Sequence, residues 1–287
     1  MKIQFNNIAM TSMLFWLDNK LLSKGEAFTN YGSYFYPINT LYFGYYSYGA
    51  PFKQMVIDES ISGATIISGV YLNGNFITIG QSGLSGINSS QGQLYFSNPI
   101  PNASTSLSGN YAVKDFNIYL TSETEEDLLF ETQFQLNPKT FQNPTGLPIN
   151  AETYPVIYLK YQGGDNEPLA FGGLDKTNIN VRAIVLSDNI FKLDAVTSIF
   201  RDTNRTLVPI IYDNEMPFNS LGSCTGHCFN YNELTQNKVV DNDYLYIDNV
   251  SVSKVDSRLT NSYNKLNPNV FTAFIDFELC KNRYPRQ

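Results

Sequence analysis

Apolar segments alternate with glycine turns in the first half of the chain, most clearly over residues 69–96. Within this stretch, residues 70–72 and 76–79 flank Asn73-Gly74, a dipeptide that adopts positive φ easily and closes two-residue type I′ hairpins. The pattern therefore predicts a β-hairpin. The stretch contains no His, Cys or acidic residue, so it supplies no acid, base or metal ligand of these types.

Short segments of strand length continue on both sides of this hairpin. Residues 28–48 are rich in Tyr and Phe and are broken by Gly and Pro. Further strands are predicted at residues 52–57, 65–67, 93–96, 111–120 and 128–134. Short strands at regular spacing are typical of a β-sandwich or barrel. We therefore expect a β-sandwich-like domain over residues 26–137.

The N-terminal segment has the periodicity of a helix rather than a strand. A helix over residues 7–24 is predicted, with Asn7 as N-cap and Gly25 as its end. Its apolar face would carry Met10, Met13, Leu14, Leu17 and Leu21. Residues 1–25 are expected to form an amphipathic arm that packs on its own chain or on a neighbouring subunit. A membrane-surface role is disfavoured because the polar side has few Lys and Arg.

The second half has a different pattern. Pro and Gly in residues 138–150 predict a linker, and residues 151–287 predict an α+β domain with a C-terminal tail. Apolar runs at 156–161 and 181–186 read as strands, and a helix capped by Asp188 follows. Later strands are expected at residues 207–212, 244–252 and 270–279. The predicted fold is mainly β with a minor α component: an N-terminal helix, a β-sandwich or barrel-like domain, then an α+β domain.

Composition narrows the function classes. Aromatic residues make up 14% of the chain and charged residues 16%, against a typical charged fraction of about 25%. The surface must then be covered largely by uncharged polar residues and tyrosine. A net charge of −7 argues against a partner that is bound by neutralising its phosphates.

One cluster contains residue types that bind metals. Cys224, His227 and Cys228 lie close in sequence, and with Cys280 they would complete the Cys₃His set that zinc accepts. Zinc motifs normally present two separated pairs, so these residues are weak metal candidates. A Cys224–Cys228 disulfide and ordinary free thiols are the alternatives, and a Cys-His nucleophile is the least favoured one. We predict no cofactor.

Three other segments have structural explanations. The acidic residues within 123–127 are expected to form a solvated turn or a capped short helix. Residues 241–243 offer oxygen atoms for calcium but lack the glycine turn and the distal Glu of a known loop. Residues 170–177 match no phosphate-binding motif and predict a tight turn before a strand. No catalytic constellation emerges, so the chain is not expected to be an enzyme.

Several segments carry a resemblance to a known class of proteins. The runs APFKQMVID (50–58), GVYLNGNFITIGQSGL (69–84), GQLYF (92–96), 110–131 and 178–202 together resemble virion structural proteins of tailed bacteriophages, specifically neck or tail proteins. The resemblance covers about residues 25–255. It implies a β-rich subunit repeated in a ring or tube of the virion, assembled in the host cytoplasm. It also implies contacts with other neck, tail or portal proteins, with no catalytic residue to carry over.

The main functional hypothesis is therefore a homo-oligomeric ring at the head–tail connection or in the tail. DNA would pass through its lumen without specific binding, and no membrane is involved. Obligate interfaces are depleted of charge and enriched in aromatic residues. The expected interface residues are Tyr34, Tyr36, Tyr42, Tyr45, Tyr46, Met13 and Leu17. The alternative is a receptor- or carbohydrate-binding β module whose tyrosines stack on sugar rings, and a polysaccharide hydrolase is the weakest hypothesis.

Overall fold

The computed structural model describes residues 4–100, 106–125, 128–129, 154–170, 172–217, 228–255 and 270–284. The helices are α1 (Phe5–Gly25), α3 (Ile190–Arg201) and α4 (Tyr231–Leu234). The strands of the first half are β1 (Phe28–Tyr34), β2 (Tyr36–Tyr42), β3 (Tyr45–Gly49), β4 (Gly69–Leu72), β5 (Asn75–Thr78), β6 (Leu84–Asn88), β7 (Gln93–Phe96), β8 (Leu107–Lys114) and β9 (Asn117–Thr121). Those of the second half are β10 (Val156–Ala170), β11 (Leu174–Ser187), β12 (Leu207–Pro209), β13 (Tyr244–Lys254) and β14 (Phe271–Arg283). Strands take up 48% and helices 18% of the described residues, which confirms the predicted mainly β class.

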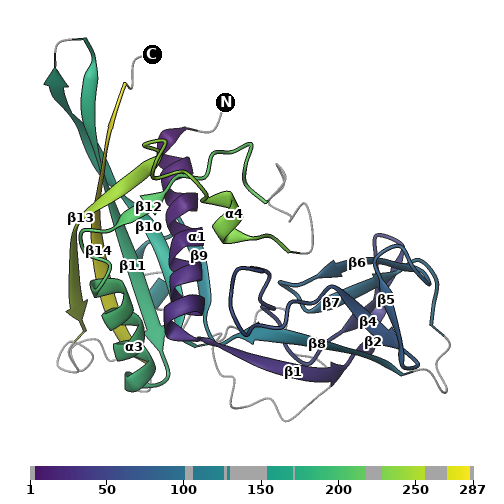
Figure 1. The fold of residues 1–287 in the computed structure, drawn as a ribbon. Coiled ribbons are helices and arrows are strands. Elements are labelled where there is room, and N and C mark those ends of the chain that lie inside the picture. The colour runs from purple at the N-terminus through teal and green to yellow at the C-terminus, as the bar shows by residue number, and fades with distance from the viewer. Residues whose placement is uncertain are drawn as a thin grey trace.

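The largest sheet has six strands in the order β12-β13-β14-β11-β10-β9. Its strand pairs are antiparallel except for β9 and β10, which run parallel. Helix α1 contacts both edge strands, β9 and β12, so the sheet must curl around the helix. The result is a half-barrel with α1 along its inner face and α3 beside it (Figure 1). We call this part the body.

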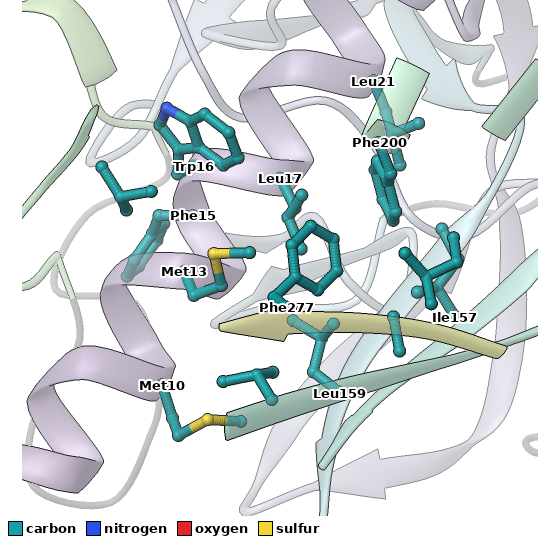
Figure 2. Packing of buried hydrophobic residues seen from close by; sticks show 14 of the residues in the cluster. Met10, Met13, Phe15, Trp16, Leu17, Leu21, Ile157, Leu159, Phe200 and Phe277 are labelled. Carbon is teal, nitrogen blue, oxygen red and sulfur yellow. The ribbon is translucent and has the colours of Figure 1, made fainter. Parts of the chain in front are cut away.

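Helix α1 fills the core of the body. Met10, Met13, Leu17 and Leu21 are buried as the sequence predicts, and Phe200 and Phe277 lie close to Leu17 in Figure 2. Burial extends well beyond the predicted face, to Ala9, Ser12, Phe15, Trp16 and Leu22. The helix is therefore a core helix rather than an amphipathic arm.

The ends of α1 also differ from the prediction. The N-cap is Gln4 and not Asn7, and the Gln4 carbonyl accepts hydrogen bonds from the backbone N–H groups of Asn7 and Ile8. Glu26 takes the left-handed conformation at the C-terminus, while Gly25 is the last helical residue. A Cβ at Gly25 would meet Ile199 Cδ1 of α3 at 3.0 Å. Glycine therefore serves close helix packing at this position.

The remaining strands form a second part, the distal module, on the right in Figure 1. One sheet has the order β1-β8-β4-β5 and the other β2-β3-β7-β6. A separate hydrophobic cluster, which includes Phe35, Tyr48, Val70, Phe96 and Tyr111, lies between the two sheets. The predicted sandwich is therefore present.

Local turn predictions in the distal module hold, while some strand predictions do not. Asn73 and Gly74 have φ of 51° and 82°, as a type I′ turn requires, which confirms the hairpin. Residues 52–57 contain only an isolated bridge, Met55 to Val113, and residues 65–67 form no strand. Both segments run beside β8 without sustained pairing. Residues 128–129 are helical, and the rest of the predicted strand 128–134 lies outside the described residues.

The predicted strand 111–120 is two strands in different sheets. The chain bends at Asp115 and Phe116. Strand β8, before the bend, belongs to a sheet of the sandwich, and β9, after it, is the edge strand of the large sheet. The boundary between the parts therefore falls near residue 115 and not at 137. Burial of Phe116 in the core of the body explains the bend. The predicted linker, 138–150, lies outside the described residues.

The second half follows the predicted pattern with different element ends. The helix predicted after residue 187 is α3, but its N-cap is Asn189, whose Oδ1 accepts a hydrogen bond from Phe191 N at 2.8 Å. The neighbouring Asp188 instead lies 3.6 Å from Lys192 Nζ. Strand β12 ends at Pro209, earlier than predicted.

Strands β10 and β11 form a long hairpin that closes at Gly172-Gly173, both with positive φ, as the predicted turn requires. Strand β9 pairs only with Val156 to Lys160, so beyond that point β10 pairs with β11 alone among the described strands. The outer half of the hairpin projects past the body at the upper left of Figure 1.

Candidate functional site

Six exposed apolar side chains of the distal module gather on the β2–β3 hairpin. Phe43 and Gly44 form its turn with φ of 47° and 87°. Positive φ at Phe43 is unfavourable for a side-chain-bearing residue, and the Tyr42–Tyr45 pair closes the turn. Phe43 is 86% exposed at the tip. We define the aromatic hairpin as Tyr36, Leu41, Tyr42, Phe43, Tyr45 and Tyr46.

Ring stacking holds the hairpin against the neighbouring strand. Tyr42 stacks on Tyr95 of β7 with ring centroids 4.8 Å apart and an interplanar angle of 13°. The Tyr95 hydroxyl donates to Gln93 Oε1 and accepts from Asn88 Nδ2, each at 3.2 Å. Burial raises the pKa of Tyr95 above its ordinary value. The aromatic hairpin therefore packs on the neighbouring strand β7 through a specific ring contact.

The structure separates the predicted interface residues into two groups. Tyr34, Tyr36, Tyr42, Tyr45 and Tyr46 are exposed, so their side chains are available to a partner. Met13 and Leu17 are 0% exposed inside the core of the body. Their prediction as interface residues is wrong, because the curled sheet covers the helix face that would have met a neighbour.

Sequence reasoning missed Leu41, Phe43, Tyr71 and Phe76, which are also exposed. The sequence contained a usable signal for two of these four residues, Tyr71 and Phe76. Tyr71 and Phe76 are symmetrically placed about Asn73-Gly74, so the predicted hairpin already makes them a cross-strand pair. Which sheet face they occupy required knowledge of the tertiary structure.

The metal candidates do not assemble among the described residues. Cys224 and His227 lie outside them. Cys228 has a free thiol that donates to Glu59 Oε1 at 2.7 Å, so it forms no disulfide with Cys224. Cys280 is a free cysteine on β14, in register with Asn178 and Tyr246. The described part of the chain has no group of three or more His, Cys, Asp or Glu side chains that could hold a metal.

The surroundings of Cys228 make it an unreactive thiol. Burial, the hydrogen bond to Glu59 and the negative charge of Glu59 together raise the pKa of Cys228 to about 12. The thiol stays protonated at pH 8, and the thiolate is the reactive form. We expect carbamidomethylation of Cys228 by iodoacetamide at pH 8 to be about 100-fold slower than that of an unperturbed cysteine, because the much smaller thiolate fraction is only partly offset by the greater nucleophilicity of a high-pKa thiolate. Peptide mass spectrometry measures the rate.

Replacement of the carboxylate gives the matched control. Glu59→Gln removes the negative charge next to the thiol and is expected to accelerate carbamidomethylation of Cys228, with little change at Cys280. Equal rates for Cys228 and a model cysteine peptide would contradict the assigned environment.

Two carboxylates of the other charged segments, Glu125 and Asp243, form ion pairs. Glu125 Oε1 accepts from Arg182 Nη1 at 2.8 Å, and Arg182 Nε also donates to Asp276 at 2.6 Å. The bonds to Asp276 and Glu125 raise the pKa of Arg182. Asp243 accepts from the Tyr212 hydroxyl at 2.7 Å and lies 3.8 Å from Lys281 Nζ. These carboxylates link strands and loops together within the body.

Comparisons with known proteins add no assignment. No protein-family model matches the chain, and a search of curated proteins found no match either. Within the described residues, no helix is both long and apolar enough to cross a membrane. The candidate functional site is the exposed aromatic surface of the distal module, on account of its exposed rings.

Proposed function

We propose that this chain is a structural subunit of a tailed-phage virion that joins copies of itself into a ring in the neck or tail. The observation that carries the proposal is the aromatic hairpin. Fully burying a single Phe side chain contributes about 1.5–3 kcal/mol, and the hairpin offers several large apolar side chains together.

Charge favours another copy of the chain as the partner. Residues 27–52, which include the whole hairpin, contain no Asp, Glu, Lys or Arg. Two copies of a chain with net charge −7 repel each other, and this repulsion is weakest where both surfaces are uncharged. Depletion of charge and enrichment in aromatic residues are also the compositional marks of interface cores.

The shape of the chain suits a ring. The projecting β10–β11 hairpin and the distal module lie at opposite sides of the molecule in Figure 1. A ring needs two different contact surfaces on each subunit, so that each copy binds its neighbours head to tail. We infer that these two ends supply the two surfaces.

The virion setting rests on the resemblance of residues 25–255 to phage neck and tail proteins. In that setting the further partners are other neck, tail or portal proteins. The negative net charge would keep DNA from adhering as it passes through the lumen.

Light scattering coupled to size-exclusion chromatography tests the assembly. We expect the chain to elute as a multiple of its 32.4 kDa mass. The triple variant Leu41→Ser/Phe43→Ser/Tyr45→Ser is expected to raise the dissociation constant at least about tenfold and shift the chain toward the monomer, because central aromatic contacts dominate interface energies.

Phe76→Ser is the matched control, because it removes an exposed phenylalanine from the other sheet and should leave the mass unchanged. A wild-type chain that remains at the monomer mass at all concentrations, or a triple variant with unchanged assembly, would contradict the proposal. A cryo-EM map of the intact particle would then show whether a virion ring contains this subunit.

A further inference from the structure

A second exposed aromatic surface lies on the outer face of the β1-β8-β4-β5 sheet. Register places Tyr34 opposite Ser108, Ser108 opposite Tyr71, and Tyr71 opposite Phe76. These four residues form one row across the sheet on the same face. Tyr34, Tyr71 and Phe76 are 58%, 37% and 48% exposed. The inner face of the same strands holds buried Val70, Ile77 and Tyr111.

The next row of this face is built from small and amide side chains. Gly32 pairs with Asn110, and Gly69 pairs with Thr78. A Cβ at Gly69 would meet Phe76 Cζ at 2.8 Å, so the Phe76 ring lies across the backbone of β4. A Cβ at Gly32 would meet Asn110 Oδ1 at 2.9 Å, so the Asn110 amide lies across β1 in the same way. Because Gly69 and Gly32 have no side chains, the Phe76 ring and the Asn110 amide can pack directly against the backbone of the sheet.

Several polar groups on this face have no hydrogen-bond partner among the described residues. The side chains of Ser108 and Asn110, and the hydroxyls of Tyr34 and Tyr71, form no hydrogen bond with any residue that the structure describes. None of the eight residues in the two rows is charged. The surface therefore combines exposed ring faces with free donors and acceptors and no ionic group.

We propose that this surface, the glycan platform, binds a neutral polysaccharide. Pyranose rings present an apolar C–H face that stacks on aromatic rings and hydroxyls at the rim that hydrogen-bond to amides and hydroxyls. Tyr34 and Tyr71 stand two strands apart, about 9–10 Å, which suits rings of one sugar chain lying across the strands. The platform consists of Tyr34, Tyr71, Phe76, Ser108 and Asn110.

The absence of charge on these rows selects the ligand class. A single-stranded nucleic acid also stacks on aromatic rings, but its binding needs Lys and Arg along the backbone path. An acidic or sulfated glycan needs the same cations. A neutral sugar chain requires no cations and therefore matches these eight uncharged residues.

The platform is independent of the proposed assembly surface. Tyr36, Tyr42 and Tyr45 share the outer face of the other sheet, since they follow the register of Ser47 and Tyr95. The two sheets pack through their inner faces, so Tyr36, Tyr42 and Tyr45 point away from the platform. Tyr46 shares the register of buried Phe96 instead. A chain in a ring can therefore keep the platform open to solvent.

Native affinity electrophoresis of the full chain provides the test. Hydroxyethylcellulose and galactomannan are the neutral polymers in the gel, and dextran sulfate is the charged comparison. We expect retardation by at least one neutral polymer and none by dextran sulfate. Tyr71→Ala should weaken retardation at least tenfold, whereas Tyr71→Phe, which keeps the ring, should retain most of it.

Further variants separate binding from folding and from assembly. Asn110→Asp places a charge on the platform and should also weaken retardation, while Phe43→Ser on the aromatic hairpin should not. Unchanged thermal melting of Tyr71→Ala shows that the fold is intact. Unretarded migration in both neutral polymers, equal retardation of wild type and Tyr71→Ala, or loss of oligomers in Tyr71→Ala would each overturn the proposal. The last result would identify the platform as a contact between copies.

Discussion

Replacing Asp18 with alanine is expected to lower the free energy of unfolding by about 3–5 kcal/mol. Asp18 Oδ1 accepts a hydrogen bond from Lys114 Nζ at 2.6 Å, and the two side chains are only 11% and 13% exposed. The variant leaves the Lys114 ammonium buried without its counter-ion. Because Asp18 lies on α1 and Lys114 ends β8, the pair also ties the distal module to the body. Guanidinium chloride unfolding measures the loss.

Two controls separate the buried charge from a general loss of contacts. The double variant Asp18→Leu/Lys114→Met removes both charges and should recover most of the stability, because no unpaired ion remains. Asp194→Ala breaks the pair of Asp194 with Lys254, in which each side chain is 50% exposed, and should change stability by less than about 1 kcal/mol. Equal losses for Asp18→Ala and Asp194→Ala would contradict the burial of the first pair.

Leu17→Ala is expected to destabilise the fold by about 2–5 kcal/mol, because it leaves a cavity between α1 and the sheet of the body. Leu17 is completely buried next to Phe200 and Phe277 (Figure 2). The chain has a single tryptophan, Trp16, which is buried on the same helix, so its fluorescence reports the unfolding transition directly. The midpoint should fall while the mass of the assembled state remains unchanged.

This variant also tests the corrected role of Leu17. If Leu17→Ala left the unfolding midpoint unchanged and reduced assembly, the residue would be at a subunit interface after all. Phe191→Ala on α3 is a suitable control, because Phe191 is 79% exposed and its removal should alter stability by no more than about 0.5 kcal/mol.

Exposed and buried aromatic residues could not be told apart from their sequence alone. Tyr34 and Phe35 are neighbours in the chain, yet Tyr34 faces solvent and Phe35 lies between the two sheets. Both have the residue type that suits a strand. Their faces depend on the register of β1 with β8, which is a long-range pairing.

The local elements were predictable because neighbouring residues decide them. Asn73-Gly74 and Gly172-Gly173 have positive φ and close hairpins, as their turn chemistry favours, and the apolar spacing in α1 and α3 favours helices. The mainly β class follows from the same local signals. The composition also indicated that exposed aromatic rings would form the candidate surface.

Tertiary structure alone decided how these elements are used. The sheet curls around α1, so Met13 and Leu17 lie in the core. The bend at Asp115 and Phe116 places β9 in the sheet of the body and not in the sandwich. Register alone aligned Tyr34, Tyr71 and Phe76 in one row. Periodicity and turn chemistry act over a few residues, whereas strand pairing and helix burial join residues many positions apart.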